Sequence, residues 1–494
     1  MKIETRNNSA YVLQMLLFCL LICFPVFMHL ATLPIRLWDE SRLAINTYEM
    51  SKNGNYLVSF FQGEPDMWNT KPTLLLWLQV LCCKLIGTGE LAIRLPSAIA
   101  AFFTALALVL FSVKYFKDFW FGFIASLVLI TSFGYMHVHG TRTGDYDSLL
   151  TFFITTYALL FFLYLENRNR IYLHLFFLAV LLAVMTKSIQ GLLILPGLFI
   201  YVIIQKQFFV FKDKWVYINL LLCIAVIACY YLSREHYTAG YLKAVWENEL
   251  GGRYMTTIEH HKADFMYYFN MLTDHHYTNW YWLVPCGMAV GFFIKDEKLR
   301  KVTLFSTLIA ITYWLVISSA QTKTEWYDLP LFPFLALIVA VIIYTGFNFL
   351  KNSTDLTKLF SFNVIPYVFL FAVFLAPYEK IIDKVYKPKE ENSNKEFYQI
   401  SYFLKDAVSS KYSIKDYHLC YDGWNTQLLF YVNLLNDAHQ NIDFKDWNNL
   451  QPGDKVIAAQ SDVKEFIQNM YSYEVIDSVK NVKRYNINGK ATVN

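Results

Sequence analysis

Long apolar runs separated by short polar segments are the feature of this sequence that most restricts its fold. A straight helix needs about 20 apolar residues to cross the hydrocarbon core of a bilayer. About eleven runs approach or exceed this length, at residues 11–33, 92–113, 119–138, 148–165, 171–186, 189–205, 215–232, 280–294, 301–319, 329–350 and 362–377. Only 17% of the residues are charged, whereas soluble proteins average about a quarter. We therefore predict a polytopic α-helical membrane protein with about eleven transmembrane helices.

The distribution of lysine and arginine predicts which loops face the cytoplasm. Short cytoplasmic loops of membrane proteins carry an excess of these residues. One alternating set of connections carries basic clusters, at Lys2/Arg6, Lys114/Lys117, Arg168/Arg170, Lys206/Lys212/Lys214, Lys295/Lys298/Arg300/Lys301 and Lys351/Lys358. We assign these connections to the cytoplasm. The other side then holds the loops 34–91, 139–147, 233–279 and 320–328, together with everything after about residue 378.

The residues after about 378 differ in character from the rest of the chain. "KPKEENSNKE" is a polar linker, and "YHLCYDG", "LLFYVNL", "DKVIAA" and "SYEVIDSV" follow it as strand-like pieces with helical stretches between them. We expect residues 1–377 to form the transmembrane domain and residues 378–494 a small extracytoplasmic α/β domain. This tail contains no recognisable catalytic motif.

The first outer loop, 34–91, is expected to be ordered on the membrane surface. "ESRLAINTYEMSKNG" reads as a short amphipathic helix that ends at Gly54, and "NYLVSFFQGE" reads as extended chain. Pro72 suits the first turn of a second helix, "PTLLLWLQVLCCKLIG", which ends at Gly87. An apolar helix of this length is expected to lie in the interface.

Two groups of acids lie at the outer ends of transmembrane runs. Asp39 and Glu40 follow the first run directly, and Arg142, Asp145 and Asp147 lie together in "TRTGDYDSLL". A carboxylate beside hydrocarbon is costly unless it is solvated or paired. The structural explanations are a solvated helix end with Arg42 as an ion partner, and an acid favoured by the helix dipole at position 147. The functional explanation is a site of acid–base chemistry or, for the D-x-D spacing, of metal binding.

Four cations on the outer side run against the bias of basic residues toward the cytoplasm. They are Lys71, Lys187, Arg253 and Lys323. Each needs an anion or a path to water, and a phosphate held at the membrane surface would satisfy several at once. The alternative is four unrelated side chains that extend to water or form separate ion pairs.

Histidine and cysteine do not indicate a zinc site. His260 and His261 are adjacent in "IEHHKADF" and could be ligands or packing residues. The eight cysteines show no CxxC or Cys/His spacing and no disulfide framework. A formal net charge of +4 is too small to suggest a nucleic-acid partner.

The first outer loop resembles that of a known family. "WDESRLAINTYEMSKNGNYLVSFFQGEPDMWNTKPTLLLWLQVLCCKLIGTGELAIRLPSAIAA" is similar to the corresponding loop of the polyprenyl-phosphate-sugar-dependent GT-C glycosyltransferases. These include the lipid A aminoarabinose transferase and the bacterial relatives of protein O-mannosyltransferases. The matching positions are Asp39-Glu40, Gly54-Asn55-Tyr56, Lys71-Pro72 with Trp77, and Glu90 with Arg94-Leu95-Pro96-Ser97.

Further motifs of the same family follow in order. "TRTGDYDSLLTFF" resembles the second-loop motif with Asp147, and "MTKSIQGLLILPG" resembles the stretch with Lys187, although "KSIQG" replaces the usual "KGP". "WENELGGRYMTTIEHHKADFMYYFNML" resembles the long outer loop with Arg253. "KTEWYDLPLFPFLAL" resembles the stretch with Lys323 and Tyr327. The resemblance covers roughly residues 10–350 and implies a GT-C fold.

The resemblance implies transfer of a sugar from a polyprenyl-phosphate donor in the bilayer to a membrane-associated or periplasmic acceptor. Asp39 is then the expected base, with Glu40 and Asp147 as supports, orienting groups or a substitute base. Lys71 and Arg253 are expected to stabilise the leaving phosphate. Lys187, Lys323 and Tyr327 are expected on the donor side, and the possible substrate-binding residues are Arg42, Arg142, Asp145, His260 and His261.

No cofactor is expected to be required. A cationic pair can neutralise a monophosphate leaving group without Mg²⁺, and Thr70 stands where the family often has a glutamate near a bound metal. A metal ligand set is therefore not assigned, although a divalent metal is not ruled out. The resemblance to bacterial members implies a multi-pass protein of the inner membrane, with the site and the tail on the periplasmic side.

Other functions stay open at the level of sequence. The acceptor could be lipid A, another envelope glycan or a protein hydroxyl, and the tail could recognise the acceptor or only pack on the outer loops. A transporter or flippase for a lipid-linked substrate would be expected to carry charges in mid-span and an internal repeat. A non-catalytic relative is the remaining alternative.

Overall fold

The computed structural model describes residues 8–252, 263–353 and 364–491. Within these residues, eight helical segments are long and apolar enough to cross a membrane. They comprise α1 (Asn8–Phe27), α4 (Glu90–Tyr115), α6 (Tyr146–Asn167), α7 (Arg170–Lys187) with η1 (Ser188–Leu192), α9 (Lys214–Tyr237), α13 (Glu297–Ser319), η5 (Glu325–Leu331) with α14 (Phe332–Asn352), and α16 (Ile365–Val385). The polytopic helical fold predicted from the sequence is confirmed.

Three predicted spans correspond to shorter helices. These are α5 (Trp120–Ile130), α8 (Leu195–Ile204) and α12 (Leu283–Phe293). Each of the eleven predicted runs thus contains a helix, although the three short ones fall below the length of a straight span. Helix α14 is buried along most of its length in the bundle, whereas α9 exposes most of its side chains at the edge.

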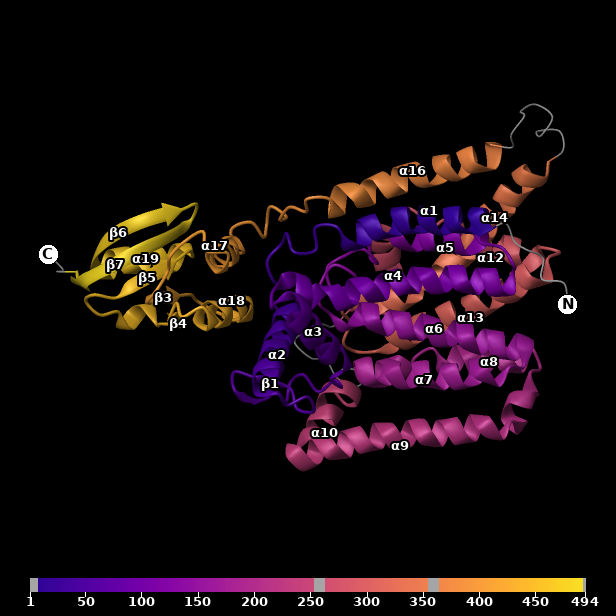
Figure 1. Ribbon diagram of the computed structural model, residues 1–494, viewed down its shortest axis with the longest axis horizontal. Coiled ribbons are helices and arrows are strands. Elements are labelled where there is room, and N and C mark those ends of the chain that lie inside the picture. The colour runs from indigo at the N-terminus through magenta and orange to yellow at the C-terminus, as the bar shows by residue number, and fades with distance from the viewer. Residues whose placement is uncertain (1–7, 253–262, 354–363, 492–494) are drawn as a thin grey trace.

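The outer loops gather at one end of the bundle, where the C-terminal domain also lies (Figure 1). The first loop forms α2 (Asp39–Asn53), a hairpin of β1 (Phe60–Phe61) and β2 (Glu64–Pro65), and α3 (Leu74–Ile86). Both expected glycine ends are present, because the N–H of Gly54 donates to Met50 O and the N–H of Gly87 donates to Cys83 O. The expected extended stretch contributes only the two short strands.

The remaining short helices belong to the later outer loops and the connections. They are η2 (Phe208–Lys212), α10 (Tyr241–Val245), η3 (Trp246–Leu250), α11 (Tyr267–Met271) and η4 (Leu272–His276). In Figure 1, α10 lies at the same end of the bundle as α2 and α3. The chain therefore returns at α10 to the end of the bundle occupied by the first outer loop.

The C-terminal domain is a small α/β unit. Its sheet has the order β4-β3-β5-β7-β6, in which β3 is parallel to β4 and β5, and β7 is antiparallel to β5 and β6. The elements are α17 (Gln399–Val408), β3 (Tyr417–Cys420), α18 (Thr426–Asp437), β4 (Asp443–Phe444), η6 (Trp447–Asn449), β5 (Lys455–Ala458), α19 (Ser461–Met470), β6 (Tyr471–Val479) and β7 (Val482–Lys490).

One predicted strand of this domain is wrong. "LLFYVNL" lies within helix α18, where Leu428, Tyr431, Val432 and Leu435 are buried. Their spacing of three and four residues places them on one helical face. A short apolar run does not distinguish a strand from a buried helix, and here tertiary packing selects the helix.

The C-terminal domain packs directly on the first outer loop. One apolar cluster joins Ile35, Ala44 and Ile45 of the loop region to Phe403 and Leu428 of the domain. The domain therefore shares a hydrophobic core with the segment that carries Asp39.

Candidate functional site

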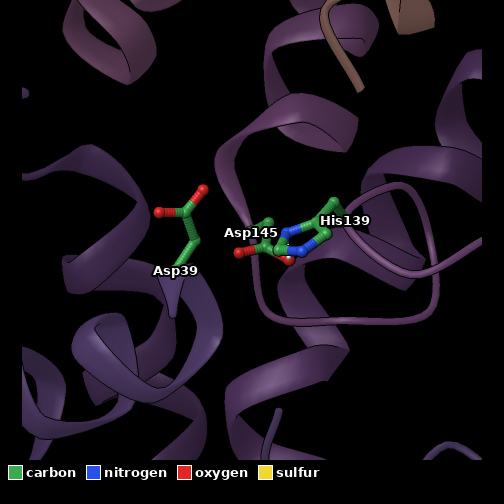
Figure 2. Close-up of side chains that lie close together, drawn as sticks. All are labelled: Asp39, His139 and Asp145. Atoms are coloured by element: carbon green, nitrogen blue, oxygen red, sulfur yellow. Dashed lines mark ion pairs between the residues drawn. The ribbon is translucent and has the colours of Figure 1, made fainter. Parts of the chain in front are cut away.

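Asp39 is the first residue of α2, and it faces a second loop at the outer end of the bundle. Its carboxylate lies close to His139 and Asp145, with one ligand atom of each residue within 4.8 Å of the others. Figure 2 shows Asp39 on one segment and the other two side chains on a separate loop. Asp39 is exposed, His139 is half-buried and Asp145 is buried.

The loop from 139 to 145 is held by short-range contacts. The N–H of His139 donates to Thr143 Oγ1 at 2.7 Å, and the Thr143 hydroxyl donates to the Asp145 carboxylate. His139 Nδ1 lies 3.3 Å from Asp145 Oδ2. Burial disfavours the charged imidazole, but the Asp145 carboxylate outweighs burial and raises the pKa of His139 to about 9. The Asp145 carboxylate therefore favours the charged form of His139.

A small cavity of about 40 Å³ collects residues from four distant parts of the chain. Its lining includes seven of the residues selected from the sequence: Asp39, Arg42, Lys71, Asp145, Asp147, Lys187 and Tyr327. The structure thus brings three carboxylates and two lysine side chains together at this cavity. Trp68, Asn69, Tyr146, Leu43 and Trp326 complete the lining.

The two lysines of this cavity have different partners. Lys187 Nζ lies 2.6 and 2.7 Å from the two carboxylate oxygens of Asp147, and both side chains are buried. Lys71 Nζ lies 3.4 Å from Glu249 Oε1, which also accepts a hydrogen bond from Thr70 Oγ1 at 3.2 Å. Sequence reasoning missed Glu249, because nothing in its neighbourhood marks it apart from its position in a long outer loop.

Glu40 is not among the residues that line the small cavity, and it binds Arg94. The carboxylate accepts from Arg94 Nε at 2.6 Å and Nη2 at 2.8 Å, and from the N–H groups of Arg36 and Gly144. Burial favours the neutral acid, but Arg94 and then the two N–H donors outweigh it and hold the pKa of Glu40 below its ordinary value. Glu40 thereby connects α2 to Gly144, the residue before Asp145. Of the roles expected for Glu40, this contact favours that of an orienting group over that of a substitute base.

Arg42 orders the first outer loop. Its guanidinium donates to both Asp66 oxygens, at 2.8 and 2.7 Å, and lies over the Phe61 ring. Asp66 also accepts from the N–H groups of Trp68 and Asn69. Arg42 is therefore ion-paired with Asp66, whereas the structural explanation made it a partner of the acids at positions 39 and 40. Its side chain also lines the small cavity.

A second cavity of about 920 Å³ lies beside the first, and Trp326 lines both. The large cavity includes Arg142 and Lys323. Arg142 donates to the carbonyls of Pro25, Val26 and Met28, and Lys323 donates to those of Ala320 and Ala263. These two cations therefore lie apart from the small cavity. Arg253, His260 and His261 fall outside the described residues.

Sequence comparison links the chain to lipid-phosphate glycosyltransferases. The family profile described as dolichyl-phosphate-mannose-protein mannosyltransferase matches residues 70–231. An undecaprenyl phosphate-alpha-4-amino-4-deoxy-L-arabinose arabinosyl transferase from Aeromonas hydrophila is 26% identical over 345 residues, which cover 68% of this chain and 59% of that protein. ArnT from Cupriavidus metallidurans bound to undecaprenyl phosphate is similar in structure, with a TM-score of 0.71 at 13% identity over 97% of this chain and 98% of that chain. In sequence and in fold, the chain is therefore similar to GT-C glycosyltransferases.

Two further proteins are similar to the chain, one in structure and one in sequence. The archaeal oligosaccharyltransferase AglB from Archaeoglobus fulgidus, in complex with an inhibitory peptide and a dolichol-phosphate, has a TM-score of 0.50 at 10% identity over 97% of this chain and 74% of that chain. An uncharacterized protein from Aquifex aeolicus is 24% identical over 356 residues, which cover 70% of this chain and 67% of that protein. The chain matches less than two thirds of the length of the arabinosyl transferase.

The donor atoms around Asp39 also fit a divalent cation. Asp145 Oδ1 is buried and lacks a hydrogen-bond partner in the described part of the chain, and the buried His139 Nδ1 has the ion-pair contact with Asp145 Oδ2. Together with the Asp39 carboxylate they form a mixed nitrogen and oxygen donor set, which suits Zn²⁺ or Mn²⁺. A signal in the sequence was available, since His139 lies six residues before Asp145 in one outer loop.

Proposed function

We propose that this protein is a GT-C glycosyltransferase, which transfers a sugar from a polyprenyl-phosphate donor to an acceptor hydroxyl at the outer face of a bacterial inner membrane. The observation that carries this proposal is the small cavity, where Asp39, Lys71, Asp147 and Lys187 converge from separate segments. A carboxylate and two ammonium groups at the end of a helical bundle suit proton removal beside a leaving phosphate.

Asp39 is the proposed base. The acceptor oxygen attacks the sugar C1 from the side opposite the phosphate, the C1–O bond to the lipid phosphate breaks, and Asp39 takes the hydroxyl proton. The configuration at C1 is therefore inverted. Asp39 is exposed, whereas Asp147 is held by Lys187 and Glu40 by Arg94. This difference favours Asp39 among the three acids.

Lys71 is proposed to stabilise the departing lipid phosphate, with Arg253 as its partner. The Lys71 side chain lines the small cavity and its ammonium group pairs with the Glu249 carboxylate at 3.4 Å, with which the phosphate oxygens would compete. Phosphate oxygens interact with such a group through the same charge-assisted hydrogen bonds. Lys187 and Tyr327 lie on the same cavity, with Lys187 Nζ 5.0 Å from the Tyr327 ring centre.

A metal ion bound by Asp39, His139 and Asp145 would supply positive charge beside the reacting phosphate. In that case Asp39 would serve as a ligand and would be less available as a base. Our expectation remains that no metal is required, because Lys71 and Lys187 already supply cations to the cavity.

The proposal is tested by sugar transfer in membranes that contain the protein and a radiolabelled polyprenyl-phosphate-sugar pool. Label in a protease-sensitive product would identify a protein acceptor, and label in the lipid fraction would identify a lipid or glycan acceptor. We expect Asp39→Asn and Lys71→Ala to abolish transfer. The exposed residues Asp462 and Lys243 provide matched controls, as Asp462→Asn and Lys243→Ala.

Full transfer by Asp39→Asn would refute the assignment of the base. Binding of the donor by the wild-type protein without any transfer would favour the transporter or non-catalytic alternatives. Movement of intact donor across the bilayer would then identify a transporter.

A further inference from the structure

The segment that leads into Asp39 is bound by the C-terminal domain and its linker at one position after another. Lys405 donates to the carbonyls of Ala31 and Thr32. The N–H of Ile35 donates to Tyr431 Oη at 2.9 Å, and the N–H of Leu37 donates to Tyr398 Oη at 3.1 Å. Two backbone amides within four residues of Asp39 are therefore held by tyrosine hydroxyls from residues more than 350 positions away.

Side chains on both flanks of this segment add further contacts with the C-terminal region. Arg36 forms a two-pronged ion pair with Glu390, at 2.9 and 2.7 Å, and its guanidinium lies 4.0 Å from the Tyr398 ring centre. On the other side of Asp39, Ser41 Oγ lies 2.7 Å from Thr426 Oγ1. The contacts thus bracket Asp39 before and after its position in the chain.

The backbone at Trp38 is in a conformation that L-residues rarely adopt. Its φ is 72° and its ψ is −121°, directly before Asp39. A large residue with positive φ is costly and persists where surrounding contacts hold it. Here the carbonyl of Trp38 accepts from Ser41 Oγ and from the N–H of Arg42, while Tyr398 holds the preceding amide.

The Tyr431 hydroxyl also connects this segment to the bundle. It accepts from Ile35 and donates to Glu90 Oε1 at 2.7 Å, at the first turn of α4. Lys405 Nζ lies 3.2 Å from the same carboxylate. The domain is therefore joined to the membrane bundle and to the Asp39 segment through one set of polar contacts.

We infer that the C-terminal domain positions the proposed base, with Tyr398 and Tyr431 as the positioning residues that hold the backbone before Asp39. This inference rests on the proposed function. An acid must lie within hydrogen-bond reach of the proton that it removes. A displacement of about 1 Å can cost about 100-fold in rate. The contacts of Tyr398 and Tyr431 restrict such a displacement.

The test compares Tyr398→Phe, Tyr431→Phe and the double variant with Tyr48→Phe. Tyr48 is a matched control, because its hydroxyl also joins α2 to the C-terminal domain, at Asp437 Oδ1, 3.0 Å away. It lies about 13 Å along the helix from Asp39 at 1.5 Å per residue. All four variants are assayed as full-length protein for kcat and for the KM of the polyprenyl-phosphate-sugar donor.

We expect the double variant to lose about 10- to 100-fold in kcat while the donor KM stays near the wild-type value. Tyr48→Phe should retain the wild-type kcat. A double variant with the kcat of Tyr48→Phe would overturn the inference. If the wild-type protein transfers no sugar, the proposed function fails. If the wild-type protein is active and the double variant has the same kcat as Tyr48→Phe, only the inference about positioning fails.

Amide hydrogen exchange provides a second measurement that does not depend on activity. Loss of the two hydroxyls should accelerate exchange in a peptide that contains Ile35 and Leu37, while Tyr48→Phe leaves that peptide unchanged. Exchange at the wild-type rate in the double variant would also overturn the inference, because the hydroxyls would then not restrain this backbone.

Discussion

The buried pair of Glu40 and Arg94 should be the contact on which the ordering of α2 depends most. The two side chains are 0% and 2% exposed. Arg94 also donates to the carbonyls of Leu30, Leu33 and Pro34, directly before the Asp39 segment. Replacing Glu40 by glutamine keeps the shape but removes the negative charge and introduces an NH₂ group among N–H donors.

The expected loss of stability follows from the geometry of this pair. Removing one partner of a buried ion pair costs about 3–5 kcal/mol, because the other charge remains buried without compensation. A loss of about 4 kcal/mol lowers the folding equilibrium constant about 1,000-fold. Glu247→Gln is the matched control, since Glu247 pairs with Lys243 on the surface and exposed pairs are worth about 0–1 kcal/mol.

Thermal unfolding in detergent measures the difference in stability between Glu40→Gln and Glu247→Gln. A double-mutant cycle with Arg94→Met isolates the interaction energy of Glu40 and Arg94. We expect the double variant to lose less stability than the sum of the single variants. The pKa of Glu40 is held below its ordinary value, so the folded state binds fewer protons than the unfolded state and the contribution is lost on acidification. The advantage of wild type over Glu40→Gln should therefore shrink as the pH falls below about 4. Equal unfolding temperatures for Glu40→Gln and Glu247→Gln at neutral pH would refute this reasoning.

Three further outcomes are expected. Glu249→Gln should tighten polyprenyl-phosphate binding about fivefold by removing a carboxylate that competes for Lys71, in line with roughly 1 kcal/mol for a partly exposed pair; unchanged affinity in a binding titration would contradict this competition. Lys187→Met should destabilise the protein by about 3–5 kcal/mol, because Asp147 is left buried without its cation; adding Asp147→Leu should recover part of the loss in the same unfolding assay, and no recovery would speak against the pair. Treatment with a chelator should leave transfer unchanged, whereas a loss restored by Zn²⁺ or Mn²⁺ would show that the cluster with His139 needs a metal.

The sequence alone does not decide which of the adjacent acids Asp39 and Glu40 faces the cavity. Successive side chains on a helix diverge by about 100°, so one acid can face the cavity while the other faces Arg94. The sequence raised both as candidates for one site. Packing against the 139–147 loop separates their roles, because Glu40 accepts the N–H of Gly144 while Asp39 lies near Asp145.

The partners in the ion pairs of the site could not be predicted from the sequence either. Asp147 and Lys187 were both selected, but each was considered as a separate charge. Lys71 was selected without Glu249, which lies 178 positions later. Coulomb attraction depends on distance in space, and nothing in the local composition indicates which distant charge lies within 4 Å.

The sequence by itself determined the helical membrane architecture and the ends of α2 and α3. These properties follow from apolar length, from periodicity and from the backbone conformation of Gly54 and Gly87, all of which are local along the chain. Only the tertiary structure decided that "LLFYVNL" is a helix, that the C-terminal domain shares a core with the first outer loop, and that His139 lies beside Asp39. These outcomes depend on contacts between segments that lie about 100 to 400 residues apart in the chain, and the free energy of such contacts is gained only when the chain is folded.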